Sequence, residues 1–195
     1  MANWAFTDYV IEGSKESLSK IYEAIKNPDN PDGSEGWEGG VLRALGIKWN
    51  ERKPDGSGKY LRGFIQDVEG IEFNPEENTT ISFYAEEAWG VTDFDEILED
   101  NFSDIKVYWC TEEEGMEVYE TNDAEGKYFQ YKYYVDTCID NNYQSEYFTT
   151  EEAVYQWLGD ITDGKIKTAD DVEKFNEEIE DTDEYINIHN FRVVS

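Results

Sequence analysis

The chain has 195 residues, of which 46 are acidic and 16 basic, giving a formal net charge of −30; 38% of its residues are hydrophobic and 15% aromatic. This apolar content is sufficient for a folded core, so the acidity does not imply disorder. The charge argues against nonspecific binding to nucleic acid or to an anionic membrane surface, since both need an excess of Lys and Arg. A basic protein or a cation is the natural complement.

The first strand is predicted from Trp4 to Glu12, with Trp4, Phe6 and Val10 facing inward. A helix follows, with Ser14 as its N-cap. Its apolar residues recur at the spacing of one buried helical stripe: Leu18, Ile21, Tyr22 and Ile25.

Residues 27–58 are rich in Gly, Pro and Asp, and are predicted to form an insertion over the core with one short helix at 41–45. Two strands are predicted next, at 60–73 and at 80–85. In the second of these, apolar and polar side chains alternate, which is typical of a strand with one buried face.

A second helix is predicted to begin at Thr92 as N-cap and to bury a stripe that includes Phe94, Ile97, Leu98 and Phe102. A hairpin follows. Its first strand buries Ile105, Val107 and Trp109, its turn is Glu114-Gly115, and Met116 and Val118 alternate on the return strand.

The aromatic stretch after residue 126 is predicted to form a third strand of this meander, with one shared face made of Phe129, Tyr131, Tyr133, Val135 and Ile139. Two helices are expected to begin near Thr149 and at Thr168, followed by a strand at 185–194. The predicted domains are therefore 1–140, a core with the insertion 27–58, and 141–195, an acidic helical C-terminal elaboration packed on that core.

The predicted order of elements, strand-helix-strand-strand-helix-strand, is that of a ferredoxin-like antiparallel sheet with helices on one face. The fold class is therefore α+β, with a ferredoxin-like core extended by the β-meander and by C-terminal helices. The chain also resembles the YubB-type ferredoxin-like family of plasmids and phages in Ala2-Asn3-Trp4, 81–90 (ISFYAEEAWG), 105–110 (IKVYWC) and 112–116 (EEEGM). The resemblance covers about residues 2–130, and it implies a fold and a mobile-element origin but no transferable chemistry.

Residues for nucleophilic catalysis are sparse. The single histidine, His189, lies in the last predicted strand, where a structural role is the more common one. Cys110 and Cys138 lie in predicted strands without a CxxC pattern, which favours reduced packed thiols over a disulfide or a reactive thiol. We expect no enzyme activity and no cofactor or metal. A two-carboxylate hydrolase and a divalent cation bound near residues 112–125 stay open as less favoured readings.

Charge is the most distinctive feature. Residues 1–65 carry 10 acids and 9 bases, whereas residues 66–195 carry 36 acids and 7 bases. On a folded surface of roughly 9,500 Å², the net charge averages about one per 320 Å², against about one per 110 Å² for B-DNA. If the acidic segment covers half of the surface, its density rises to about one per 160 Å², within a factor of two of DNA.

We therefore expect a cytoplasmic, non-enzymatic acidic protein that occupies a basic, nucleic-acid-binding surface of a host protein as a DNA mimic or anti-defence inhibitor, with no direct contact to nucleic acid or membrane. A solvated face that only maintains solubility is the competing reading for each acidic cluster. The candidate partner-binding residues are Asp93, Asp95, Glu96, Glu99, Asp100, Glu112, Glu113, Glu114, Asp170, Asp171, Glu173, Glu177 and Glu178.

A second hypothesis is a small regulatory or ligand-sensing module. In it the insertion 27–58, with Trp37 and Trp49, closes a pocket over the sheet. An apolar pocket beneath the two tryptophans would favour this hypothesis over the acidic binder.

Overall fold

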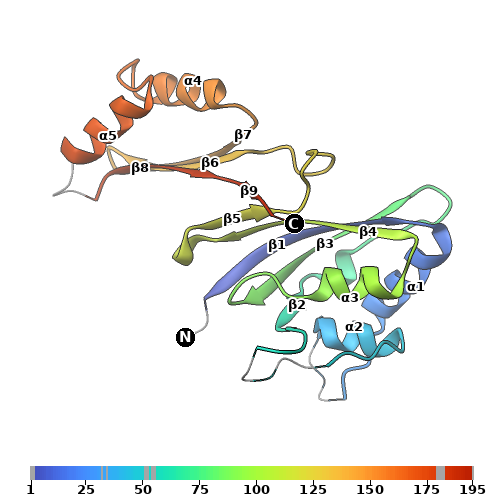
Figure 1. The fold of residues 1–195 in the computed structure, drawn as a ribbon. Coiled ribbons are helices and arrows are strands. Elements are labelled where there is room, and N and C mark those ends of the chain that lie inside the picture. Colours follow the sequence, from blue (N-terminus) through green and yellow to red (C-terminus); the bar gives the residue numbers. More distant parts are fainter. Residues whose placement is uncertain are drawn as a thin grey trace. The chain divides into compact units, whose positions relative to one another are not determined.

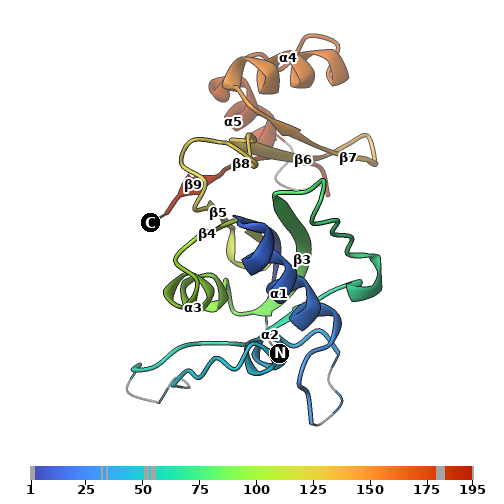
Figure 2. The same cartoon turned by 90° about the vertical axis from the view of Figure 1, so that its right-hand side faces the viewer.

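The computed structural model describes residues 3–31, 33, 35–50, 53, 56–178 and 183–194. Contacts between Cα atoms divide the chain into two compact units, unit 1 (Met1–Asp123) and unit 2 (Ala124–Val194). Figure 1 and Figure 2 show the helices and strands of each unit. The predicted α+β class is confirmed, and the domain boundary expected at residue 140 falls inside unit 2.

Five strands of unit 1 form an antiparallel sheet in the order β2-β3-β1-β4-β5. Their bounds are β1 (Trp4–Gly13), β2 (Gly63–Ile65), β3 (Thr80–Ala88), β4 (Ile105–Glu113) and β5 (Val118–Thr121). The helical segments are α1 (Lys15–Lys26), α2 (Glu38–Ala44), α3 (Phe94–Asn101) and the 3₁₀ turns η1 (Val68–Gly70) and η2 (Glu114–Met116).

Helix α1 begins as predicted. The Ser14 hydroxyl accepts a hydrogen bond from the Ser17 backbone N–H at 3.2 Å, which satisfies one of the free donors at the helix start. Leu18, Ile21 and Ile25 are fully buried along one stripe. The short helix expected within the insertion is also present, as α2.

The inward face of β1 differs from the predicted one at Trp4 and Phe6, whereas Val10 is buried as predicted. Ala5 and Tyr9 are buried, whereas Trp4 and Phe6 are 43% and 44% exposed. The Tyr9 ring packs on Phe83 of β3 and on the edge of Phe94 of α3, at centroid distances of 5.1 and 6.2 Å. The size of the apolar side chains does not predict which face of this strand is buried. The strand buries Thr7 and Tyr9, whose hydroxyl groups have polar partners beneath the helices.

Three local boundaries of unit 1 also differ from the predictions. The strand expected at 60–73 is only Gly63–Ile65, because Asp67 adopts a left-handed backbone conformation and η1 follows it. Asp93, rather than Thr92, occupies the N-cap position of α3. On the return of the hairpin, η2 and the left-handed Glu117 shift the alternation, so that Tyr119 is buried and Met116 is exposed.

Unit 2 has a three-stranded antiparallel sheet in the order β7-β6-β8, with both helices packed over one face (Figure 1). Its elements are β6 (Tyr133–Ile139), β7 (Asn142–Phe148), α4 (Glu151–Ile161), α5 (Ala169–Glu178), β8 (Tyr185–Asn190) and β9 (Arg192–Val193).

The aromatic strand is shorter than predicted and lies in a different sheet. It begins at Tyr133, it leaves Tyr131 exposed, and it pairs with β7 and β8 instead of extending the β4–β5 hairpin. Asp140 and Asn141 both have positive φ and form a two-residue turn into β7. Such turns match the twist of the paired strands, and Asp and Asn tolerate their backbone conformation.

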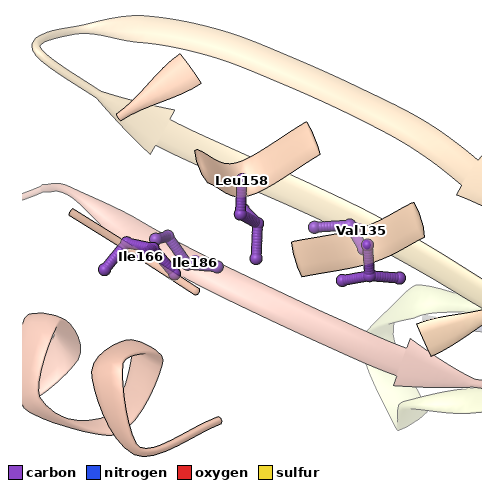
Figure 3. Packing of buried hydrophobic residues seen from close by; sticks show 5 residues of the cluster. Val135, Leu158, Ile166 and Ile186 are labelled. Carbon is purple, nitrogen blue, oxygen red and sulfur yellow. The ribbon is translucent and has the colours of Figure 1, made fainter. Parts of the chain in front are cut away.

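Helix α4 is capped by Thr150, whose hydroxyl accepts from the Ala153 N–H at 3.2 Å, one residue later than predicted. The helix supplies Val154 and Leu158 to the core of unit 2, and Leu158 points from α4 toward the sheet (Figure 3). The fully or nearly buried residues of this core are Val135, Val154, Leu158, Ile166 and Ile186. Helix α5 begins directly after Thr168, as expected. The spacing of Val172, Phe175 and Ile179 predicts one buried stripe for this helix, and Ile179 lies outside the described residues.

Candidate functional site

Glu96 and Asp100 on the outer side of helix α3, and Asp93 just before it, lie near one lysine; the Asp93 carboxylate also accepts a hydrogen bond from the Tyr60 backbone N–H. Glu96 forms an ion pair with Lys59, which lies in the chain just before β2. The hydrogen bond to Glu96 and the charges of Glu96, Asp93 and Asp100 raise the pKa of Lys59, against a smaller opposing effect of burial. Within residues 66–123, which carry 19 acids, Lys106 is the only base. This side of α3 therefore already attracts a cation from its own chain.

Two other acids of α3 have internal roles. The indole Nε1–H of Trp109 donates to Asp95 Oδ2 at 2.7 Å, and burial raises the pKa of Asp95. Glu99 accepts the Val107 backbone N–H at 2.7 Å and forms an ion pair with Lys106 at 3.0 Å. Both carboxylates therefore help to fasten α3 to β4.

The cluster expected at Glu112, Glu113 and Glu114 is divided by the alternation of β4. Glu113 is buried next to Gly90, and burial raises its pKa. Glu112 is half-buried on the opposite face of the sheet, where it pairs in register with Phe6. Of the three, only Glu114, at the start of η2, is exposed. Reversing all three charges would thus disturb the core as well as the surface.

Helix α5 presents most of the predicted acids of unit 2 to solvent. Asp171 accepts from the Thr168 hydroxyl at 2.9 Å and from the Lys167 N–H at 3.0 Å, and these hydrogen bonds lower its pKa. The other four predicted residues of this helix are exposed: Asp170, Glu173, Glu177 and Glu178. Asp170, Glu173 and Glu177 share one side of the helix by their spacing of three and four residues.

A buried pair of carboxyl groups in unit 1 was not predicted. Glu38, the first residue of α2, and Glu87 of β3 are both completely inaccessible to solvent. Glu87 accepts from the Thr7 hydroxyl, from the Tyr9 hydroxyl at 2.9 Å and from the Thr92 backbone N–H at 3.0 Å. The Thr92 hydroxyl donates to Glu38 Oε2 at 2.8 Å, whereas Glu38 Oε1 is buried without a hydrogen-bond partner.

Glu38 accepts from the Thr92 hydroxyl and the Gly63 backbone N–H, against three donors at Glu87, and this difference favours a proton on Glu38 over one on Glu87. Three donors stabilise a carboxylate at Glu87, while burial, followed by the charge of Glu87, raises the pKa of Glu38 well above its ordinary value. Gly63 makes the arrangement possible, because a side chain at this position of β2 would collide with the Glu38 carboxyl group. One sequence signal was available for half of this pair: the alternation through Ile81, Phe83 and Ala85 continues inward to Glu87.

The insertion is held by aromatic contacts. The rings of Trp37 and Trp49 meet edge to face at 6.4 Å, and the Arg43 guanidinium lies 4.8 Å from the Trp37 ring. A groove of about 560 Å³ is lined by α1, the end of α2 and Phe102, and neither tryptophan lines it. This groove lies beside the helices of unit 1, and the pocket expected beneath Trp37 and Trp49 stays a prediction, since parts of the insertion lie outside the described residues.

The two cysteines and the single histidine, which were the other candidates for catalysis, lie in surroundings that favour structural roles. Cys110 and Cys138 are free thiols, and burial, together with the charges of Glu112, Asp8 and Asp123, raises the pKa of Cys110 to about 12. A thiol in this state is a poor nucleophile at neutral pH. His189 Nε2 lies 2.9 Å from Asp136 Oδ1 across neighbouring strands. Among the described residues, no group of three or more His, Cys, Asp or Glu side chains is arranged to hold a metal ion.

Comparison of the chain with protein-family models, with curated proteins and with solved structures finds no match. Within the part of the chain that the structure describes, no helix has both the length and the apolar character needed to cross a membrane.

Proposed function

We propose that this chain is a cytoplasmic, non-enzymatic acidic protein that binds a basic, nucleic-acid-binding surface of a host protein. The observation that supports this most directly is the outer side of α3, where Glu96 forms an ion pair with Lys59 and the charges of Asp93 and Asp100 add to it. The segment 66–123 that contains α3 has one base of its own. The exposed acids of α5 supply a second negative surface. Surfaces of this kind accelerate encounter with a basic partner by electrostatic steering and select against acidic ones.

The proposal includes a ferredoxin-like core of the YubB type and an origin in a mobile element, where such a protein would act as an anti-defence inhibitor. The antiparallel order β2-β3-β1-β4, with α1 between β1 and β2 and α3 between β3 and β4, supports the ferredoxin-like part. Fold alone does not determine function. The inhibitory role therefore depends on the charged surfaces.

If the protein imitates DNA, only part of its surface can approach the charge density of DNA. The chain exposes 11,586 Å², which corresponds to about 390 Å² per net charge, several times more dilute than B-DNA. Of the thirteen acids expected to bind a partner, seven are exposed: Glu96, Asp100, Glu114, Asp170, Glu173, Glu177 and Glu178. These residues define the acidic surfaces that the proposal assigns to the partner.

We expect Glu96→Lys with Asp100→Lys on α3, or Glu173→Lys with Glu177→Lys on α5, to weaken partner binding by about tenfold or more at low salt. The reason is that each pair of substitutions changes the local charge by four without removing a buried side chain. The measurement is retention of proteins from nuclease-treated lysate on the immobilised chain, followed by affinity measurement with the purified partner at increasing salt concentration.

A matched control is Glu16→Lys with Glu23→Lys, which reverses two exposed charges on α1, outside the proposed surfaces. Support requires one basic nucleic-acid-binding protein that is displaced by duplex DNA, is lost at high salt, and binds the α1 variant like the wild type. Binding that is unchanged in both the α3 and the α5 variants would overturn the acidic-binder proposal.

A further inference from the structure

A groove of about 430 Å³ lies within unit 2, between its helices and its sheet. Its volume is within the range of ordinary ligand pockets. The residues that give it chemical character come from α4, α5, β6 and β8: Glu151, Tyr155, Val172, Glu173, Tyr133 and Ile188.

The groove combines two phenol rings, two carboxylates and an apolar wall. Glu151 and Tyr155 lie one helical turn apart on α4, and Tyr133 is the first residue of β6. The three side chains are close enough to interact, since desolvation, the charge of Glu151 and the neighbouring Tyr133 all raise the pKa of Tyr155. Among the described residues that line the groove there is no Lys, Arg or His.

The local field is negative even though two helices begin here. Glu151 opens α4 and Ala169 opens α5, and each helix start contributes about half a positive charge. The first turns of these helices, however, carry the carboxylates of Glu151, Glu152, Asp170 and Asp171. Glu173 adds another carboxylate at the groove. A cationic ligand is therefore favoured over an anion.

We propose that this groove binds an arginine side chain of a basic partner, with the guanidinium between the tyrosine rings and the carboxylates and its methylene groups against Val172 and Ile188. This inference rests on the proposed function and specifies how the acidic protein would select its partner. A guanidinium fits because it is planar, stacks on aromatic rings and donates two parallel hydrogen bonds to a carboxylate. Lysine offers a point charge without this geometry, and a neutral side chain leaves both carboxylates without a cation.

The second prediction is tested on the full chain by NMR titration with Nα-acetyl-arginine amide. We expect saturable shifts of the amide signals of Tyr133, Tyr155, Val172 and Ile188, with affinity at least threefold above that of Nα-acetyl-lysine amide. Nα-acetyl-norleucine amide, which has a comparable aliphatic chain without charge, is expected to bind at least tenfold more weakly. Glu151→Gln and Glu173→Gln should each weaken arginine binding by about threefold to tenfold.

Glu152→Gln is the matched control, because Glu152 is an exposed acid of the same helix and does not line the groove. The proposal is overturned if the lysine or norleucine amide binds as well as the arginine amide. It is equally overturned if the shifts lie outside the groove, or if Glu152→Gln weakens binding as much as Glu151→Gln. The titration needs no partner protein, so its failure is distinguishable from failure of the acidic-binder proposal, which the variants of α3 and α5 test.

Discussion

Leu158→Ala is expected to destabilise unit 2 by about 2–5 kcal/mol, the usual cost of removing a buried leucine side chain and leaving a cavity. Leu158 is fully buried and packs among Val135, Val154, Ile166 and Ile186 (Figure 3). A unit of this size has a total stability of about 4–10 kcal/mol. The substitution therefore removes a large part of the free energy of unfolding of unit 2.

Native-state hydrogen exchange, read by mass spectrometry on peptides from 133–161, measures this effect in unit 2 specifically. The amide groups of β6 and α4 should exchange faster by one or more orders of magnitude in the variant. Gln156→Ala, an exposed position on the same helix, serves as the control and should leave exchange almost unchanged. Equal exchange in the wild type and Leu158→Ala would contradict the role of Leu158 as the centre of this core.

Periodicity predicted the helices of this chain better than it predicted the partners of its strands. The stripes of α1 and α3 could be read from the sequence because a helical face needs only local spacing. The strand at 133–139 was expected beside the β4–β5 hairpin, yet it pairs with β7 and β8. Pairing is decided by distant residues, and the Asp140-Asn141 turn that creates β7 has no glycine to signal it.

The inward face of β1 was misread for a related reason. Trp4 and Phe6 are the largest apolar residues of this strand, but its buried face carries Thr7 and Tyr9, whose hydroxyls donate to Glu87. A polar residue is acceptable in a core when its hydrogen bonds are made there. The sequence contains the residues of this hydrogen-bond network but does not show that they meet, because Glu87 is some eighty positions from Thr7 and Tyr9 in the chain.

The acid content of the candidate segments could be predicted from the sequence, but the exposure of each acid could not. Counting acids identified α3 and α5 correctly as strongly acidic. It could not separate Glu96 and Asp100, which are exposed, from Asp95 and Glu113, which have internal positions. That separation depends on which carboxylates meet donors such as the Trp109 indole N–H, and these contacts form only when the helices pack on the sheet.

The buried pair gives the last prediction, in which two similar substitutions should have opposite effects. The folded state keeps a proton on Glu38 above the ordinary pKa of 4.5, at which this group ionises in the unfolded chain. Between these two pKa values the folded state binds more protons, so the free energy of unfolding falls by about 1.4 kcal/mol for each unit of rising pH. Glu38→Gln, a neutral isostere, should remove this loss and stabilise unit 1 at pH 7–8 by about 1–3 kcal/mol.

Glu87→Gln should instead destabilise unit 1 by about 1–3 kcal/mol, because an amide N–H₂ replaces an oxygen that accepts from buried donors. Urea denaturation of both variants at pH 5.5 and pH 8 measures the difference, with the exposed Glu77→Gln as control. The gain from Glu38→Gln should grow with pH, since it replaces a group whose ionisation opposes folding. Stabilisation by Glu87→Gln together with destabilisation by Glu38→Gln would place the proton on Glu87 and reverse the assignment made from the hydrogen bonds.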